Sequence, residues 1–299
     1  MLLILITALA LNISSHFNLL KNMSPVSAAA HKKCLNIIPK VSKNYASLTS
    51  LVCGEKITDA ELRGNLIKTS IIHIFIVSGS HLIFIDSFFE FFCFPFFVRF
   101  IFLSIYSMAT GLEPPTVRAL IGIIIKKIIR DKSWGYPSDL LTLLTGLCTL
   151  NFFSSWWQSI SFLMSWCASL ALSAPSLLRI KTPLLRVFCS QCSVFIIMLF
   201  PLFSFGSLHP LSILYNLFLG NIVAFVLLPL SFLALLNSNL TLLFDNFMEL
   251  FNSAVAHFSE PILIESHTPL PIGYLWVWLF SWHLLFHFSR IYLFKGMSQ

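Results

Sequence analysis

Long apolar runs recur through most of this chain, and they constrain its fold more than any other feature. A helix needs about 20 mainly apolar residues to cross the hydrocarbon core of a membrane, where backbone hydrogen-bonding groups must all be paired. Candidate membrane helices follow one another over residues 71–86, 91–110, 116–130, 139–155, 158–178, 187–205, 211–236 and 272–294. The sequence therefore predicts an all-α, polytopic integral membrane protein with about seven to nine transmembrane or re-entrant helices.

The composition excludes the common soluble classes of protein. Hydrophobic residues make up 57% of the 299 residues and charged residues only 10%, whereas soluble domains average about 25% charged residues. A soluble fold of this size could not hide so much apolar surface, which excludes a cytosolic enzyme, a disordered chain and a disulfide-stapled secreted domain. The net charge of +7 first reports which loops face the cytoplasm, and it also suits an anionic polymer as partner.

The chain divides into three parts by composition. Residues 1–20 are apolar in their first half and form either a retained membrane helix or a signal-like segment. The retained helix is favoured because no basic residues precede the apolar run. Residues 21–69 are a short polar and amphipathic region, and residues 70–299 form the membrane domain.

The polar region is expected to begin as a linker, because it contains Pro25 and Pro39. Its end spaces apolar residues as a helix does. Thr58 and Glu61 form a capping-box pattern, which predicts a helix starting near Thr58.

The cysteines suit packing more than metal binding. Most of the seven lie in apolar runs, where a thiol behaves as a small hydrophobe. Cys189 and Cys192 form a C-x-x-C pattern with no second Cys/His pair nearby, which favours helix packing over a redox or zinc site. Cys34 and Cys53 lie in the polar region and can pair if that region is extracytoplasmic. The sequence alone leaves both states open.

Two basic clusters indicate the topology of the middle of the chain. One is formed by Lys126, Lys127, Arg130 and Lys132, and the other by Arg179, Lys181 and Arg186. The two candidate spans between them keep both clusters on one side of the membrane. Because cytoplasmic loops collect Lys and Arg, we expect both clusters to face the cytoplasm.

The segment His73-Ile-Phe-Ile-Val-Ser-Gly-Ser-His81 places polar side chains within a run otherwise suited to lipid. Buried polar groups in a membrane segment are costly and mark functional sites. Ser78 and Gly79 can break the helix and open its backbone to a ligand, as short or broken membrane segments do when they line a pathway. The alternative is an amphipathic helix that packs its polar side against other helices.

The segment Thr110-Gly-Leu-Glu-Pro-Pro-Thr-Val-Arg118-Ala119 is the second informative stretch. Gly111, Pro114 and Pro115 predict a tight turn, and Thr116 is expected to cap the helix that follows. A cation gains nothing from the dipole at a helix N-terminus. Arg118 therefore indicates another partner, such as Glu113, lipid phosphate or a passing polyanion, unless its side chain simply reaches to the membrane interface.

The Arg99 guanidinium is expected deeper in the membrane, where pairing with Glu90 or Asp86 is predicted. Signatures of enzymes are missing from the sequence: it has no P-loop, G-x-G-x-x-G or H-E-x-x-H motif, no H-x-H-x-D-H metal signature and no G-x-S-x-G elbow. We therefore predict no enzyme activity, no catalytic residue, no cofactor and no metal site.

Taken together, the two segments resemble the ComEC-type competence proteins, which are inner-membrane channels for DNA uptake. HIFIVSGSH is similar to the family's H-hydrophobic-SG-x-H signature, and TGLEPPTVRA is similar to its T-G-x-x-P-x-x-x-R-A motif. SISFLMSW and the spacing of Asn216, Asn221 and Pro229 are similar to later family motifs. The sequence departs from the family pattern at Ser80, where an apolar residue is usual, and at Asn221, where the family has a proline.

The resemblance covers about residues 50–236 and concerns the permease core only. Residues 21–69 are too few for the family's OB-like domain, and no metallo-β-lactamase-like segment is recognisable. The resemblance implies a channel or permease in the bacterial cytoplasmic (inner) membrane that takes up single-stranded DNA during natural transformation. It implies other competence proteins as partners, such as a DNA receptor, a helicase or a separate nuclease.

The proposed pathway residues are His73, Ser78, Gly79, His81, Arg118 and Asn216. The proposed structural turn comprises Thr110, Gly111, Pro114 and Pro115. Two other functions remain open: a small-solute or lipid transporter that uses the same broken helices, and a membrane assembly subunit that transports nothing.

Overall fold

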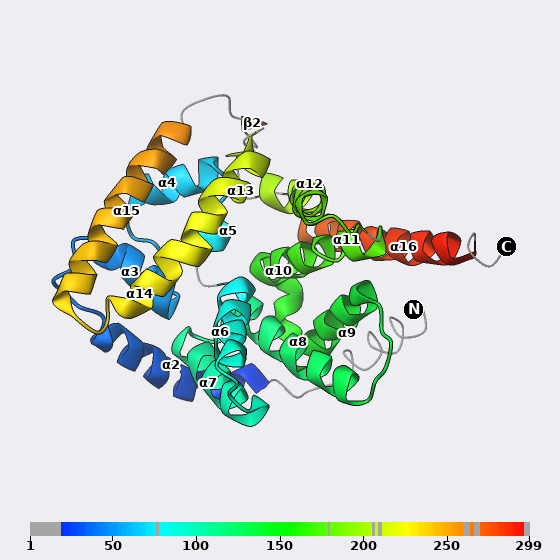
Figure 1. The fold of residues 1–299 in the computed structure, drawn as a ribbon, viewed down its shortest axis with the longest axis horizontal. Coiled ribbons are helices and arrows are strands. Elements are labelled where there is room, and N and C mark those ends of the chain that lie inside the picture. The colour runs from blue at the N-terminus through cyan, green and yellow to red at the C-terminus, as the bar shows by residue number, and fades with distance from the viewer. Residues whose placement is uncertain are drawn as a thin grey trace. The chain divides into compact units, whose positions relative to one another are not determined.

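The computed structural model describes residues 19–75, 78–178, 180–204, 207–208, 211–259, 264–265 and 270–295. The predicted first membrane helix over residues 1–20 lies outside these ranges, except for the backbone of Leu19 and Leu20. Arg179 lies outside them as well. Within the described residues the fold is helical, and the one sheet is a pair of two-residue strands (Figure 1). The predicted all-α class is therefore confirmed.

The chain folds into two compact units. We call residues 21–120 and 206–266 the motif unit, because both informative segments lie in it. We call residues 121–205 and 267–299, together with residues 1–20, the aromatic unit. The chain passes from the motif unit into the aromatic unit inside α8 (Pro114–Asp131).

The motif unit contains most of α2 and the first part of α8. Its elements are α2 (Leu19–Ile37), α3 (Tyr45–Cys53), α4 (Ala60–Lys68), α5 (Ile72–Phe75), α6 (Gly79–Phe91), α7 (Phe96–Ala109), β1 (Ser207–Leu208), α13 (Ser212–Ile222), the π-helical turn η2 (Val223–Leu227), α14 (Leu228–Leu233), α15 (Ser238–Phe258) and β2 (Ile264–Glu265). The strands pair antiparallel, with Ser207 opposite Glu265. A disulfide joins Cys34 of α2 to Cys53 of α3.

α13, η2 and α14 form one continuous rod. Pro229 lacks an N–H and would break the hydrogen-bond ladder of an ordinary α-helix. The π-helical turn stands directly before it and absorbs the irregularity. α15 runs back beside this rod, from Thr241, whose hydroxyl donates to Ala234 O at 2.8 Å, to Phe258, whose ring lies 5.5 Å from that of Tyr215 (Figure 1).

The core of the motif unit lies between α3, α4, α5, the rod and α15. Its fully buried side chains include Leu48, Leu51, Leu66, Ile71, Phe75, Val223, Leu227, Phe244 and Met248. Apolar side chains from distant parts of the sequence meet in this core. Removing that surface from water or lipid headgroups is the main force that holds the unit together.

One carboxylate ties α15 to the loop between α2 and α3. The side chain of Asp245 is buried and accepts hydrogen bonds from Ser42 Oγ at 2.6 Å, Lys43 N at 3.0 Å and Asn44 N at 3.1 Å. A buried charge is tolerated when donors surround it in this way. Asp245 therefore fixes a loop that lies about 200 residues away in the sequence.

The aromatic unit contains the rest of α8 and the remaining helices. They are α9 (Ser138–Phe152), the short 3₁₀-helix η1 (Ser154–Gln158), α10 (Ile160–Ala171), α11 (Ala174–Leu177), α12 (Pro183–Phe203) and α16 (Ile272–Lys295). Indole groups join these helices: Trp166 Nε1 donates to His283 Nε2 at 2.9 Å, and Trp276 Nε1 donates to Trp157 O at 2.8 Å. The ring of Trp166 also lies against Gly146 of α9, where any side chain would collide with it.

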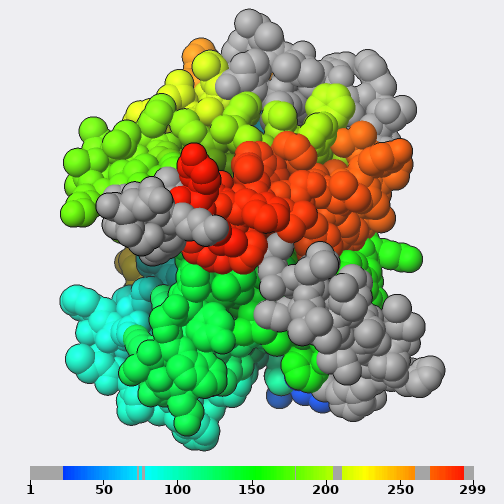
Figure 2. All heavy atoms as spheres, turned by 90° about the vertical axis from the view of Figure 1, so that its right-hand side faces the viewer, coloured from blue at the N-terminus to red at the C-terminus, as the bar shows by residue number. Residues whose placement is uncertain are grey.

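Three stretches are long and apolar enough to cross a membrane among the described residues: Ile160–Leu177, Pro183–Phe203 and Ser212–Leu233. Only 11% of the second is buried inside the protein. Its exposed side chains, such as Leu184 and Phe188, are those that lipid favours. α12 lies beside α16, and Figure 2 shows α16 (orange to red) at the surface of the molecule. The chain is a membrane protein.

Two local predictions were wrong. The linker expected around Pro25 is part of α2, because the residues after it, from Ser27 to Ile37, include strong helix formers and extend the helix. The helix expected to start near Thr58 is capped by Asp59 instead. The Asp59 carboxylate accepts hydrogen bonds from the N–H groups of Glu61 and Leu62 at 3.0 and 3.1 Å. Asp59 therefore caps the helix in place of the Thr58 hydroxyl, which lies one residue earlier.

Candidate functional site

The first informative segment breaks where its Ser-Gly pair predicts. Ser78 has an extended backbone and is the N-cap of α6, which begins at Gly79. His81 Nδ1 accepts the N–H of Ser78 at 2.9 Å, so the ring proton of the neutral imidazole lies on Nε2. The hydroxyls of Ser78 and Ser80 are 2.6 Å apart. The start of α6 is thus organised by the polar side chains of the motif itself.

His81 is only 2% exposed, and its Nε2 has no hydrogen-bond partner among the described residues. Leaving a buried donor unpaired costs about 1–3 kcal/mol. Such a group in a native fold calls for an explanation, and a ligand or water that binds at the start of α6 would supply one.

Gly79 packs directly against the start of α8. A Cβ atom at this position would lie 3.0 Å from Pro115 O and 3.2 Å from the Cβ of Ala119. The close approach of two helices therefore requires glycine here. This contact brings the SGSH and EPPTVRA segments together, although they are well separated in the sequence.

α8 begins at Pro114, two residues before the expected cap. Proline suits the first helical position because its fixed backbone angle is helical and its missing N–H is not needed there. The prediction that Thr116 caps the helix was wrong: its hydroxyl donates back to Glu113 O at 2.7 Å from inside the first turn. With prolines at its first two positions, this helix start offers few free N–H groups, so an anion would have to be bound by side chains.

Arg118 is the side chain of that kind. It is only 6% exposed and lies three residues after Pro115 and directly before Ala119. Residues three and four apart share a helix face, so Arg118 flanks the face of α8 that contacts Gly79. The guanidinium keeps its charge at any depth and presents several donors in a fork that suits phosphate oxygens.

Side chains of α2 contact the turn before α8. Gly111, at φ 79°, and Leu112, at φ 54°, both take the left-handed conformation that ends α7. Ser27 Oγ donates to Met108 O at 3.1 Å, and His31 Nδ1 lies 2.9 Å from Ala109 O. The turn lies at Thr110, Gly111 and Leu112, while Pro114 and Pro115 of the proposed turn belong to α8. A segment about 80 residues earlier in the sequence holds this turn.

The same histidine reaches a carboxylate. His31 Nε2 lies 3.0 Å from Glu55 Oε2. The His31 ring thus lies between two acceptors, Ala109 O and the Glu55 carboxylate. Burial raises the pKa of the nearby Glu113 carboxyl, while the positive charges of Lys56 and His31 partly oppose this shift. Sequence reasoning missed this cluster, because only the fold brings its members together.

The remaining predicted pathway residues lie around α5. The backbone of His73 belongs to α5, and its side chain is outside the described part of the structure. Asn216 lies on α13, 7% exposed, and its Oδ1 has no hydrogen-bond partner among the described residues. One turn further on, a Cβ at Gly220 would lie 3.0 Å from the side chain of Ile74. Asn216 therefore lies on the face of α13 that packs against α5, separately from the contact between Gly79 and α8.

Comparison with known proteins decides the family. The family model described as Competence protein matches residues 51–293, which is well over half of the chain. The chain belongs to this family. No curated protein and no solved structure matches it significantly.

The competence-family match contains both segments that meet at Gly79 and all six proposed pathway residues. It also extends beyond residue 236, where the motif resemblance ended, through α15 and almost to the end of α16. Both units of the fold therefore contribute to the competence-family region.

An ion cluster supports α6 in this competence-family fold. Arg99 of α7 donates from Nε to Asp86 Oδ1 at 2.8 Å, and its Nη2 lies 3.2 Å from Glu90 Oε2. The predicted pairing of Arg99 is confirmed with both carboxylates. Because the three charges join α6 to α7, they fix the helix whose first residues carry the SGSH motif.

Within the described ranges, no group of three His, Cys, Asp or Glu side chains comes together that could hold a metal ion. Cys189 and Cys192 lie half-buried on α12. The groups beside the contact of α6 with α8 include the His81 imidazole and the Arg118 guanidinium, which are suited to hydrogen bonds and to anionic ligands.

Proposed function

We propose that this competence-family protein is a membrane channel or permease through which single-stranded DNA enters the cell during natural transformation. The contact of Gly79 with Pro115 and Ala119 carries the proposal. It joins the two polar motifs of the family in a chain that is otherwise mostly apolar. Next to this contact, on the helices that form it, lie a buried arginine and a histidine donor that has no partner among the described residues.

A polyanion crossing a membrane needs a hydrated lane with partners for its phosphates, because phosphate contacts dominate the affinity for nucleic acids. Ser78, Gly79, His81 and Arg118 supply hydroxyl, backbone, imidazole and guanidinium groups for such a lane. His73 and Asn216 belong to its proposed continuation along α5 and α13. We propose binding and passage only, with no covalent chemistry and no metal or cofactor.

We propose a multi-pass arrangement in the bacterial cytoplasmic membrane, with about seven to nine transmembrane or re-entrant helices. Disulfides persist in oxidising compartments, so the Cys34–Cys53 bond supports an extracytoplasmic position for residues 21–69. The basic cluster at 126–132 supports a cytoplasmic position for the end of α8. An odd number of crossings then separates the two.

Partners follow from the same proposal. The double-stranded DNA outside the cell must be captured and one strand degraded, and the strand that enters must be drawn inward. We therefore propose a DNA receptor, a separate nuclease and a helicase as the proteins that act with this channel. The purified chain should show no nuclease activity with added zinc, magnesium or manganese.

Uptake of labelled DNA in a deletion strain tests the proposal. The wild-type gene should restore entry of DNA into a nuclease-protected form. Arg118→Ala should abolish entry, while Arg118→Lys, which keeps the charge and loses the fork, should retain part of it. Normal uptake by the deletion strain, or by both variants at wild-type protein levels, would contradict the proposal.

A further inference from the structure

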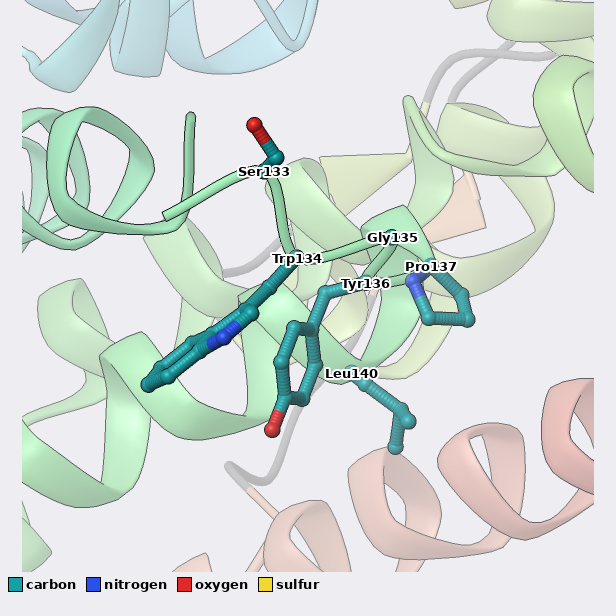
Figure 3. Close-up of a pocket in the computed structure, with 6 residues that line it drawn as sticks. All are labelled: Ser133, Trp134, Gly135, Tyr136, Pro137 and Leu140. Carbon is teal, nitrogen blue, oxygen red and sulfur yellow. The ribbon is translucent and has the colours of Figure 1, made fainter. Parts of the chain in front are cut away.

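The loop after α8 exposes two aromatic side chains that the proposed pathway does not use. Trp134 is 54% exposed and Tyr136 is 51% exposed. Their ring centroids are 6.0 Å apart, with 54° between the ring planes. With Ser133, Gly135, Pro137 and Leu140 they line an open hollow of about 460 Å³ (Figure 3). Figure 3 shows both rings extending from the loop in the same direction.

Hydrogen bonds fix the backbone of the loop that carries these rings. Ser133 adopts the left-handed conformation and donates its N–H to Arg130 O at 3.1 Å, and the N–H of Trp134 reaches Ile129 O at 3.0 Å. The N–H of Tyr136 then closes a tight turn onto Trp134 O at 2.9 Å. A backbone that is already ordered loses little conformational freedom on binding, which favours affinity.

Cations lie on the helix turns just before the aromatic pair. Residues 126–132 hold four basic side chains and one acidic side chain, a net charge of +3. Lys127 pairs with Asp131, and Lys126, Arg130 and Lys132 are exposed. The loop folds back onto the last turn of α8. The basic residues of that turn directly precede, in the sequence, the residues that line the hollow.

We propose that this hollow is a binding subsite for single-stranded nucleic acid, in which bases stack on Trp134 and Tyr136 while the cations of α8 contact phosphates. Aromatic platforms next to basic residues bind single strands in this manner without sequence preference. The inference rests on the proposed function, which brings a single strand to the cytoplasmic side, where the basic cluster is expected. The subsite would receive the strand as it leaves the membrane.

Anionic lipid is the competing ligand, because Trp, Tyr and basic residues also gather at membrane surfaces. Rings that only anchor a helix in the headgroup region need no shared hollow and no rigid turn between them. Here one turn orients both rings to the same side, directly after a run of cations. A strand carries a phosphate next to each base, so adjacent rings and cations can contact both groups.

Photo-crosslinking to a bromodeoxyuridine-substituted oligonucleotide locates the subsite. The purified full chain in nanodiscs of zwitterionic lipid should crosslink through the peptide that contains residues 133–140. The double variant Trp134→Ala/Tyr136→Ala should bind the oligonucleotide at least about tenfold more weakly by fluorescence anisotropy, as expected for the loss of base stacking. Trp134→Phe/Tyr136→Phe keeps both rings and should bind nearly as the wild type does.

The matched control removes two other exposed rings of the aromatic unit, Tyr274→Ala/Tyr292→Ala, and should leave binding unchanged. Equal binding by the wild type and by Trp134→Ala/Tyr136→Ala, with crosslinks elsewhere, would overturn the subsite and leave the proposed function intact. Quenching of Trp134 fluorescence by brominated phosphatidylglycerol, unaffected by the oligonucleotide, would assign the hollow to lipid and overturn the subsite as well. Failure of the wild type to bind any oligonucleotide, together with normal DNA uptake by the deletion strain, would reject both proposals.

Discussion

Different kinds of contact join the helices in the two units of this protein. In the motif unit, polar groups connect segments that are far apart in the chain: Asp245 with residues 42–44, His31 with Glu55 and Ala109, and the Cys34–Cys53 disulfide. In the aromatic unit, ring packing and indole hydrogen bonds join the helices, together with an ion pair between Arg290 of α16 and Asp139 of α9, and α12 leaves most of its surface open to lipid.

This difference indicates that the two units have different roles. A buried polar contact is costly in a membrane protein unless water, a partner or a ligand is present. Among these contacts, those of His31 lie at the turn before α8, whereas Asp245 and the disulfide hold α2, α3 and the loop between them. The aromatic unit holds two of the three described stretches that are able to cross a membrane, Ile160–Leu177 and Pro183–Phe203. The predictions below test whether the polar contacts are as specific as this comparison requires.

The largest expected effect is at Gly79. The Gly79→Val substitution forces side-chain atoms against Pro115 O and Ala119, so it should separate α6 from α8 and reduce transformation by at least about a hundredfold. Gly64→Ala is the matched control, because a Cβ at Gly64 of α4 meets open space. That variant should transform normally. Both variants are compared by transformation frequency at equal protein levels. Normal transformation by the Gly79→Val strain would contradict the requirement for a close contact between Gly79 and α8.

The next effect is on the stability of the motif unit. Asp245→Ala leaves the donors of Ser42, Lys43 and Asn44 without their acceptor, and it should lower the free energy of unfolding by about 3 kcal/mol. The control is Glu249→Ala on the same helix. Glu249 makes a 3.8 Å ion pair with Lys43 between two exposed side chains, which is worth less than about 1 kcal/mol. Thermal unfolding in detergent compares them, and equal melting temperatures would contradict the anchoring role of Asp245.

Removing the disulfide should have a similar but slightly smaller effect. Cys34→Ser/Cys53→Ser frees a loop with a sequence separation of 19 residues, for which the loss of stability is about 3 kcal/mol. In the wild type, a thiol reagent should label Cys34 and Cys53 only after reduction. Cys189→Ser/Cys192→Ser in the aromatic unit should melt as the wild type does. Labelling of Cys34 without reductant in protein isolated from cells would contradict the extracytoplasmic placement.

The smallest effect concerns pH. Glu113 is an acid whose pKa is raised by burial, so the folded state binds its proton more tightly than the unfolded state does. Its stabilising contribution is present below the ordinary pKa of 4.5 and is lost as the pH rises through the higher folded pKa. Glu113→Gln should therefore match the wild type near pH 4 and melt about 2 °C higher at about pH 8. A lower melting temperature at that higher pH would show that charged Glu113 is stabilised by Lys56 and His31.

The sequence predicted features that depend on local chemistry. The helix break at Ser78-Gly79, the turn at Gly111 and the pairing of Arg99 within the α6–α7 hairpin all involve residues close together in the chain. The exact helix starts at Asp59 and Pro114 were missed by one or two residues, because several side chains in a row were suitable caps.

Contacts between distant segments could not be predicted in this way. Nothing near His31 in the sequence indicates Glu55 or Ala109 as its partners, and the contact of Gly79 with Pro115 depends on how α6 and α8 pack. Asp245 offered one usable signal, since a carboxylate on the apolar face of a helix implies a buried set of donors. Its donors, at residues 42–44, are specified only by the fold.

The most direct test of the account is whether incoming DNA passes the start of α6. In a chain whose free cysteines are replaced by serine, Ser80→Cys places a small thiol at an exposed position of this helix start, and Tyr292→Cys places one on the exposed face of α16. A membrane-permeant thiol reagent is applied to competent cells with and without transforming DNA. We predict that DNA slows labelling of the Ser80→Cys variant and leaves labelling of the Tyr292→Cys variant unchanged. Equal labelling of the Ser80→Cys variant with and without DNA, in cells that transform normally, would contradict the proposed route through the motif unit.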